Sequence, residues 1–431
     1  MEYFSLNDKA QTSTFENAVL KGLAPDKGLY FPKEIKKLPA SFFEEIKSLS
    51  KTEIAFEVIK NFIGNEIPEA ELKKIIQTTL DFDFPLVKLN ENISVLELFH
   101  GPTLAFKDVG AKFMAGSLGY FIKKGNLGKV TVLVATSGDT GGAVANGFLG
   151  VEGIEVVILY PKGKVSEIQE KQLTTLGQNI MALEVTGTFD DCQEMVKQAF
   201  LDKELQQKMQ LTSANSINVA RWLPQMFYYF FAYQQLAEEK RKLVFSVPSG
   251  NFGNICAGLL AKKMGLPISH FVASSNVNDV VGRYLKTEKY KPKPSVQTIS
   301  NAMDVGNPSN FIRILELFQN QFGDLKEELS SFSFDDEVTK EAIKEVYKST
   351  GYMMDPHGAV GYLGLGSFLK QNPEYNGIFL ETAHPVKFLE TVENVIGKKL
   401  EIPGSIRSIL KKEKRAKQIG SYSDLKGFLM Q

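Results

Sequence analysis

Residues 242–273 read KLVFSVPSGNFGNICAGLLAKKMGLPISHFVA, and this stretch decides the fold class. The apolar run 242–247 has the length and composition of a buried β-strand. A turn rich in Gly, Ser and Asn (248–254) follows it, then a helical segment to about Met264, then a short strand over 270–273. A strand, a turn, a helix and a second strand in this order predict a βαβ unit, and therefore a parallel sheet.

The same pattern recurs elsewhere in the chain. Upstream, Lys129–Ala135 predicts a strand, the segment from Thr140 to about Leu149 predicts a helix, and Glu155–Tyr160 predicts another strand. Downstream, Gly377–Leu380 is a strand-like run that leads into a loop and a helix. The predicted fold class is therefore α/β with parallel sheets. In such sheets the loops at the carboxyl ends of the strands bind ligands.

The length of the chain predicts more than one domain, because 431 residues exceed what one ordinary core accommodates. Helical patterns over 14–21 and 52–62 predict an additional, mainly helical unit at residues 1–88. Strand and helix patterns then alternate to the end of the chain. We expect one α/β domain over residues 89–212 and a second over residues 213–431.

The composition excludes several classes of protein. Lys plus Arg and Asp plus Glu number 50 each, so no excess positive charge favours nucleic-acid binding. No run of about 20 apolar residues could span a membrane, and the N-terminus lacks the features of a signal peptide. The 2 cysteines (Cys192, Cys256) and 4 scattered histidines show no metal-ligand spacing. The sequence predicts a cytoplasmic protein with no metal, membrane or nucleic-acid partner, and leaves its oligomeric state open.

The turn Ser249–Asn254 is a candidate phosphate site. Glycines at 250 and 253 allow backbone N–H groups to approach an anion, and the N-terminus of the following helix adds a favourable dipole. It is not a P-loop or a dinucleotide fingerprint, since neither Gly-Lys-Ser/Thr nor G-x-G-x-x-G is present. An ordinary tight strand–helix turn would have the same spacing, so both interpretations stay open.

A second loop, TSGDTGG at 136–142, also joins a strand to a helix. Its hydroxyl and N–H groups suit a carboxylate or a phosphate. The alternative is that Ser137, Asp139 or Thr140 caps the helix. Two such loops in one sheet favour a ligand with two anionic ends.

Lys107, in the segment LFHGPTLAFKD (98–108), is a candidate nucleophile. Apolar neighbours and a helix N-terminus make it easier for an amine to lose its proton, as covalent catalysis by lysine requires. The alternative interpretation is that Lys107 is an ordinary solvated lysine.

Two further polar segments are candidates for ligand binding. Arg221 follows the polar loop SANSIN at 213–218 and could bind a phosphate or carboxylate through two parallel hydrogen bonds, or form a surface ion pair. Thr382 follows a strand, and its hydroxyl could bond a buried ring nitrogen. His384, before a proline, is expected to be structural rather than a base.

Taken together, these segments closely resemble the threonine synthase family, which are pyridoxal-phosphate enzymes of the tryptophan-synthase-β type of fold. The resemblance covers nearly the whole chain up to about Leu400. It includes GLAPDKGLYFP at 22–32 and NAMDV at 301–305, in addition to the segments described above. It implies the lyase fold, with two α/β domains and the N-terminal unit, and pyridoxal 5'-phosphate as cofactor.

The resemblance also implies roles for individual residues. Lys107 would be the catalytic Schiff-base lysine. The cofactor phosphate would lie in a cup formed by Gly250, Asn251, Phe252, Gly253 and Asn254, and Thr382 would face the pyridine nitrogen. The substrate would bind at Ser137, Asp139, Thr140, Asn215, Ser216 and Arg221.

The reaction implied by the resemblance converts O-phospho-L-homoserine and water to L-threonine and phosphate. A related lyase, such as a serine/threonine dehydratase or a cysteine-synthase-like enzyme, would use the same lysine and cup. A non-catalytic protein that binds phosphorylated metabolites would keep the loops but would have no need for Lys107. The long N-terminal unit and the segment 213–221 count against the related lyase.

Overall fold

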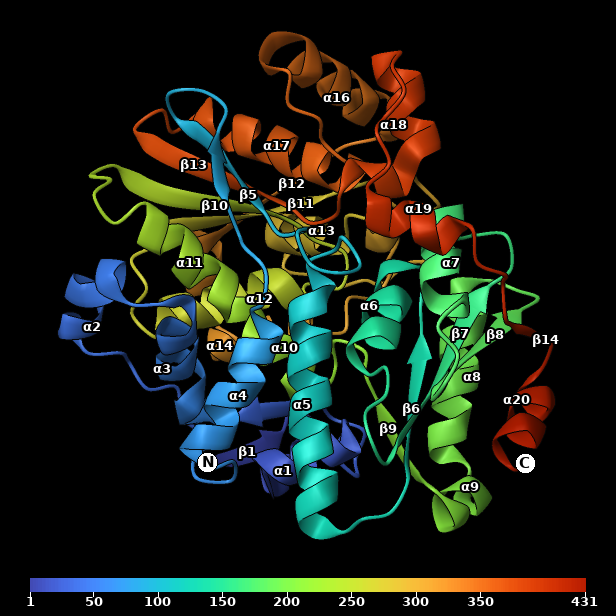
Figure 1. Cartoon of the computed structure of the whole chain (residues 1–431). Helices are drawn as coiled ribbons and strands as arrows, with labels where there is room; N and C mark the ends of the chain where they lie inside the picture. The colour runs from blue at the N-terminus through green and yellow to red at the C-terminus, as the bar shows by residue number, and fades with distance from the viewer.

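The N-terminal unit of the computed structural model, which describes residues 1–431, combines helices with a small antiparallel sheet of order β2-β1-β3 (Figure 1). Its elements are β1 (Glu2–Ser5), β2 (Thr12–Thr14), α1 (Phe15–Lys21), β3 (Tyr30–Pro32), α2 (Ala40–Glu45), η1 (Ile46–Ser48), α3 (Lys51–Ile63) and α4 (Glu69–Thr79). Helix α3 begins with a capping box formed by Ser50 and Glu53. The predicted helices are confirmed. The sheet was not predicted, because strands of three or four residues are too short to show a clear alternation of apolar and polar residues.

A mixed six-stranded sheet has the order β12-β11-β10-β13-β5-β4, and only β4 runs antiparallel. Its strands are β4 (Leu86–Lys88), β5 (Ile93–Glu97), β10 (Lys242–Pro248), β11 (His270–Ser275), β12 (Leu329–Ser333) and β13 (Tyr375–Glu381). The unit predicted over 242–273 is confirmed, since Val244 pairs with His270 in a parallel register. Phe245 faces the main core, while its neighbour Val244 packs on the opposite face.

The second large sheet is entirely parallel, with order β14-β8-β7-β6-β9. Its strands are β6 (Val130–Ala135), β7 (Ile154–Pro161), β8 (Ile180–Val185), β9 (Gln210–Ser213) and β14 (Lys417–Ile419). Every residue of β6 is buried because both faces of the sheet are covered. Val132 and Val134 contribute to the main core, and Leu133 packs into a separate cluster with Cys192. The predicted α/β class is therefore confirmed.

Helices cover both faces of the two sheets (Figure 1). After the N-terminal unit they are α5 (Lys107–Gly125), α6 (Asp139–Gly147), α7 (Glu167–Thr174), α8 (Phe189–Leu201), α9 (Lys203–Lys208), α10 (Val219–Trp222), η2 (Leu223–Met226), α11 (Phe227–Gln235), α12 (Gly253–Lys263), α13 (Val280–Thr287), η3 (Asn301–Met303), α14 (Phe311–Leu317), α15 (Phe322–Glu328), α16 (Asp336–Thr350), α17 (Pro356–Leu369), η4 (Pro385–Phe388), α18 (Leu389–Ile396), α19 (Gly404–Leu410) and α20 (Tyr422–Leu429). Helix α17 packs on the six-stranded sheet, and α8 packs on the five-stranded sheet.

The two sheets do not follow the expected divisions 89–212 and 213–431. Strand β5 pairs with β13 in the six-stranded sheet, and β14 near the C-terminus pairs with β8 in the five-stranded sheet. Residues 89–212 thus contribute β5 to the six-stranded sheet, which is built mainly from residues 213–431. Residues 213–431 contribute β14 to the five-stranded sheet, which is built mainly from residues 89–212. Tertiary packing determines which strands pair, so the periodicity of the local sequence could not assign the partners. We therefore propose 1–88, 89–212 and 213–431 as consecutive segments of the chain. The last two do not each correspond to one sheet.

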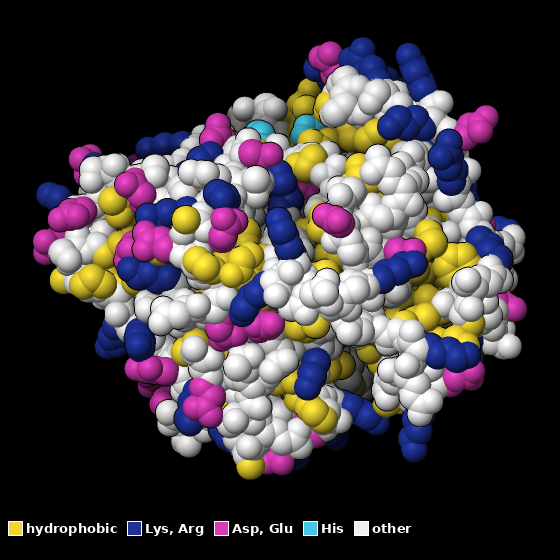
Figure 2. Space-filling model, turned by 60° about the horizontal axis from the view of Figure 1, so that its bottom comes forward, with side chains coloured by type: hydrophobic (Ala, Val, Ile, Leu, Met, Phe, Trp, Pro, Cys, Tyr) yellow, Lys and Arg dark blue, Asp and Glu magenta, His cyan; other side chains and the backbone are white.

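Basic and acidic side chains intermix on the face shown in Figure 2, in keeping with the equal numbers of the two kinds. No helix is long and apolar enough to cross a membrane.

A buried ion pair joins the two sheets. Lys387 in η4 lies 2.7 Å from Asp139 at the start of α6, and their side chains are 0% and 4% exposed. Lys387 also donates to the carbonyl of Thr103, and Gln169 donates to the Asp139 carboxylate. Burial alone would raise the pKa of Asp139, but Lys387 and Lys107 hold it well below its ordinary value. The Asp139 carboxylate therefore remains ionised at neutral pH.

Replacing Lys387 with Met should lower the free energy of unfolding by about 3–5 kcal/mol, because it leaves the Asp139 carboxylate buried without a partner. Denaturant unfolding at pH 7 measures the change. The matched control combines Lys387→Met with Asp139→Asn, which removes both charges and should recover part of the loss. Wild-type stability of the single variant would show that the pair does not hold the sheets together.

Candidate functional site

A cavity of about 450 Å³ lies where several strands end. Ala135 ends β6, Pro248 ends β10, and Thr382 follows β13, and all three line it. This is the edge at which parallel sheets place ligands. All but one of the predicted site residues line this cavity: Lys107, Ser137, Thr140, Asn215, Ser216, Arg221, Gly250, Asn251, Phe252, Gly253, Asn254 and Thr382.

Lys107 begins helix α5, and its side chain reaches the cavity. Burial lowers the pKa of Lys107 below its ordinary value; Lys387 and Arg221 add to this effect, and Asp139 opposes it. The interpretation of Lys107 as an ordinary solvated lysine is therefore wrong. A lysine whose charged form is disfavoured can act as a nucleophile and as a base.

The turn between β10 and α12 presents a row of free donors to the cavity. The backbone N–H groups of residues 250–255 donate no hydrogen bond within the protein. Phe252 has φ +60°, a left-handed conformation that bends the turn around this row. A Cβ at Gly250 would lie 2.6 Å from the Cα of Met303, so only glycine fits there. Free N–H groups at a helix N-terminus form an anion site suited to a phosphate.

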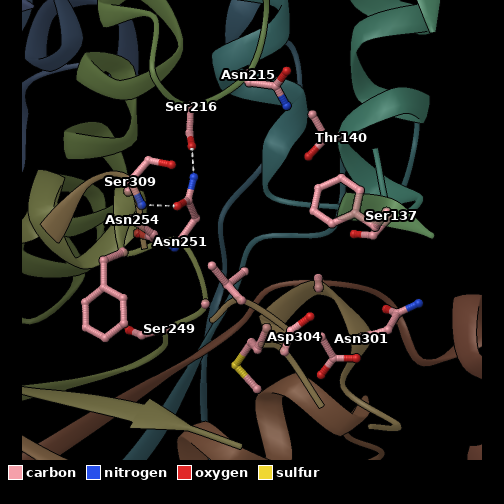
Figure 3. Close-up of a pocket in the computed structure, with 18 of the residues that line it drawn as sticks. Ser137, Thr140, Asn215, Ser216, Ser249, Asn251, Asn254, Asn301, Asp304 and Ser309 are labelled. Atoms are coloured by element: carbon pink, nitrogen blue, oxygen red, sulfur yellow. Dashed lines mark hydrogen bonds between the residues drawn. The ribbon is translucent and has the colours of Figure 1, made fainter. Parts of the chain in front are cut away.

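Asn251 fixes the shape of this turn from the side. Its Oδ1 accepts a hydrogen bond from the backbone N–H of Ser309 (2.6 Å), and its Nδ2 donates to Ser216 Oγ (2.8 Å). Figure 3 shows both contacts on one side of the cavity, with Ser137 and Thr140 on the other.

The loop between β6 and α6 provides a second set of free donors. Thr136 Oγ1 accepts hydrogen bonds from the backbone N–H groups of Gly138 and Gly141. The N-cap residue is Gly138, and no side chain caps the helix in the way that Ser137, Asp139 or Thr140 was expected to do. That alternative is wrong, since Thr136 inside the loop takes the role. The N–H groups of residues 137, 139 and 140 remain unbonded within the protein and can bind an anion.

Asp139 is the predicted residue that does not line the cavity. Its carboxylate is held by Lys387 and Gln169 in the buried ion pair, so only its backbone belongs to the loop. No local feature of the sequence signals the role of Lys387, because a lysine two residues after His-Pro resembles many solvated lysines.

Arg221 in α10 is 3% exposed and forms no ion pair with any carboxylate of the chain. Its Nη1 donates to the carbonyl of Ala214, and its Nε has no partner. The expected alternative, a surface ion pair, is therefore wrong. Burial lowers the pKa of Arg221 to about 10, so the group remains a cation at neutral pH. A cation that lines a cavity with unused donors can bind an anionic ligand.

Thr382 and His384 follow β13 but have different surroundings. Thr382 lines the cavity, and its hydroxyl makes no hydrogen bond within the protein, so it is free to bond a ligand. His384 Nδ1 accepts a hydrogen bond from the N–H of Val386, and burial lowers the pKa of His384 to about 4. The neutral ring caps η4, which agrees with the expected structural role.

Among the cavity residues that were not predicted as site residues, His357 and Asp304 carry titratable side chains. His357 Nδ1 contacts Asp355 (2.5 Å), and its Nε2 accepts from the N–H of Ala302 (3.2 Å). The Asp-Pro-His sequence at 355–357 signals a helix start, but nothing in it signals the contact with Ala302. Asp304 accepts from Thr298 and Asn276, and burial raises the pKa of Asp304 to about 6.

Three family models match the chain. The family model "Pyridoxal-phosphate dependent enzyme" matches residues 77–377, "Threonine synthase N terminus" matches residues 2–80, and "Threonine synthase, C-terminal" matches residues 358–428. Threonine synthase of Haemophilus influenzae is 48% identical over 407 residues, which cover 94% of each chain.

Solved structures agree over the full length. The crystal structure of threonine synthase from Escherichia coli matches with a TM-score of 0.94 at 42% identity, covering 100% of this chain and 99% of that one. The structure of PLP-bound threonine synthase from Brucella melitensis matches with a TM-score of 0.92 at 34% identity, covering 100% and 98%. The chain therefore belongs to the threonine synthase family of pyridoxal-phosphate-dependent enzymes.

Proposed function

We propose that this enzyme converts O-phospho-L-homoserine and water to L-threonine and phosphate. The observation that carries the proposal is one cavity that holds an amine of lowered pKa, Lys107, and two loops with free backbone donors. A cofactor phosphate and a substrate with both a carboxylate and a phosphate require more than one anion site. The names of the relatives support threonine as the product.

The residues of the cavity fit pyridoxal phosphate. We propose that Lys107 binds its aldehyde, the N–H groups of residues 250–254 bind its phosphate, and the Thr382 hydroxyl bonds its ring nitrogen. When bound, the cofactor accepts electron density from the substrate and so stabilises negative charge at carbon. A hydroxyl beside the ring nitrogen, rather than a carboxylate, leaves that nitrogen without a strong partner for a proton.

The substrate carboxylate would bind the second loop, where the N–H groups of residues 137, 139 and 140 are free and the hydroxyls of Ser137 and Thr140 line the cavity. Asn215 and Ser216 lie on the connection that follows β9, with Arg221 beyond them. We propose that this group binds the substrate phosphate. A guanidinium supplies direction as well as charge, so it would orient the phosphate before it leaves.

Lys107 would also move the protons of the reaction. Its lowered pKa makes the neutral amine more available as a base, and its position at the cavity lets it reach carbon atoms beside the bound amine of the substrate. Removal of protons from Cα and Cβ would precede loss of phosphate from Cγ. A proton would then return to Cγ, which becomes the methyl group, water would add at Cβ, and a proton would return to Cα.

We propose that the enzyme works in the cytoplasm. Both cysteines are free and buried, which fits a reducing compartment.

The test is to incubate the purified holoenzyme with O-phospho-L-homoserine and to measure phosphate and threonine together. Equal amounts of the two products are expected. L-serine, L-threonine and unphosphorylated L-homoserine are the matched controls. A dehydratase would instead form a 2-oxo acid from serine or threonine, and a non-catalytic binding protein would release nothing.

Replacing Lys107 with Ala should abolish turnover, because one amine both holds the cofactor and moves protons. The visible absorbance of the lysine-bound cofactor should also disappear, while the circular dichroism spectrum stays that of the folded protein. Lys112 lies on the same helix, pairs with Asp81 at its surface, and provides the matched control Lys112→Ala. Wild-type absorbance and activity in Lys107→Ala would end this assignment.

Gly250→Ala should weaken cofactor binding by about tenfold or more, since its Cβ would lie 2.6 Å from the Met303 backbone and displace the turn. Equilibrium dialysis against pyridoxal phosphate measures the effect. Gly366→Ala in helix α17 is the control, because nothing lies within 4 Å of its Cβ position. Equal cofactor affinity in both variants would place the phosphate site elsewhere.

Arg221→Ala should keep its cofactor but lose kcat/KM for O-phospho-L-homoserine by about 100-fold, as loss of a charge-assisted contact worth about 3 kcal/mol implies. Arg221→Lys keeps the charge but not the planar fork, so it should also be impaired. Steady-state kinetics and cofactor absorbance measure the two properties separately. Near-normal kinetics, or loss of cofactor without loss of substrate affinity, would contradict the assignment.

A further inference from the structure

Arg313, in helix α14, is a completely buried cation that was not predicted as a functional residue; its exposed fraction is 0%. Its Nη1 donates to Asn310 Oδ1 (2.7 Å) and to the carbonyl of Ser216 (3.1 Å). Its Nη2 donates to the carbonyls of Ile217 (2.7 Å) and Tyr30 (3.1 Å). The guanidinium therefore connects the N-terminal unit to the loop that carries Ser216.

All these acceptors are neutral. No carboxylate of the chain forms an ion pair with Arg313, and its face lies over the ring of Trp222 at 4.4 Å. The nearby titratable groups are also uncharged, because burial raises the pKa of Cys256 to about 12 and that of Tyr3 well above its ordinary value. The protein itself thus leaves the charge of Arg313 without a compensating anion.

One layer of side chains separates Arg313 from the free donors of residues 250–255. Asn310, which accepts from Arg313, donates through Nδ2 to the carbonyl of Asn251 (3.1 Å) and to Ser216 Oγ (3.1 Å). A Cβ at Gly253 would lie 3.3 Å from the same Nδ2. The buried charge is therefore directly behind the anion site of the turn.

We propose that Arg313 is the buried counter-charge of the cofactor phosphate, and that it keeps this phosphate fully ionised while positioning Asn310 and Ser216 behind the turn. The inference rests on the proposed placement of the phosphate at residues 250–254. Burying an unpaired cation is costly, so an anion must compensate it when the ligand is bound. A purely structural link between neutral carbonyls needs donors but no charge. Arg313 acts through other groups and is a positioning residue.

Phosphorus NMR of the holoenzyme tests this inference, because the chemical shift of the bound cofactor phosphate reports its ionisation. A free phosphate monoester loses its second proton near pH 6. In the wild type, the shift should stay constant between about pH 5.5 and 8.5, since nearby positive charge favours the dianion. In Arg313→Gln, the apparent pKa of the phosphate should rise by about one unit or more, so that the signal moves within this range.

Two variants separate charge from structure. Arg313→Lys keeps the charge with fewer hydrogen bonds, so its phosphorus signal should remain constant with pH even where its thermal stability falls. Arg407→Gln is the control for loss of an arginine, because Arg407 is exposed and pairs with Glu401. The dissociation constant of pyridoxal divided by that of pyridoxal phosphate gives a second readout. Of these variants, only Arg313→Gln should lower this ratio.

A constant phosphorus signal in Arg313→Gln, equal to that of the wild type, would overturn the proposal. If Arg313→Gln does not fold, the phosphorus signals of the wild type and of Arg313→Lys test the proposal instead. A wild-type signal that titrates as in the free cofactor would overturn the proposal. A signal that stays constant with pH in both proteins supports it. Failure of the underlying phosphate assignment looks different, since Gly250→Ala would then retain its cofactor. If Gly250→Ala loses cofactor affinity while the phosphorus signal of Arg313→Gln stays constant with pH, only the role of Arg313 is rejected.

Discussion

The buried ion pair between Lys387 and Asp139 is the interaction on which the arrangement of the cavity depends. It joins the loop after β13 to the start of α6, and Lys387 also holds the carbonyl of Thr103, a few residues before Lys107. Segments from both large sheets therefore meet at one point. Because neither charge is exposed to water, separating them would leave a buried ion without a partner, which is strongly unfavourable. This fixes the Lys107 amine relative to the loop at 136–142.

Several cations around the cavity lack an anionic partner within the protein. Lys107, Arg221 and Arg313 have no carboxylate partner, and the free N–H groups of residues 137, 139, 140 and 250–255 add partial positive charge. Burial of these cations is unfavourable in the protein alone. An anionic ligand would offset this cost, so the same charges would favour ligands with phosphate and carboxylate groups.

The turn that presents the free donors is supported from behind. Asp355 orients His357, and His357 accepts a hydrogen bond from Ala302, whose carbonyl and the Met303 backbone lie against Gly250. Asn310 and Asn251 support the other side of the turn. The donors therefore do not depend on the ligand for their direction, and a preorganised site loses less entropy on binding.

The sequence by itself determined the α/β class and the loops at the strand ends, because strand and helix periods and glycine-dependent turns are local properties of the chain. It also singled out Lys107 and the glycines at 250 and 253 as candidates. The resemblance to a family added the roles. Only the tertiary structure decided which strands share a sheet, that the Asp139 side chain turns from the cavity to Lys387, and that Arg313 lies behind the turn at 248–254. These contacts join residues far apart in the sequence. Their partners are selected by packing and by desolvation of charge, which no local pattern records.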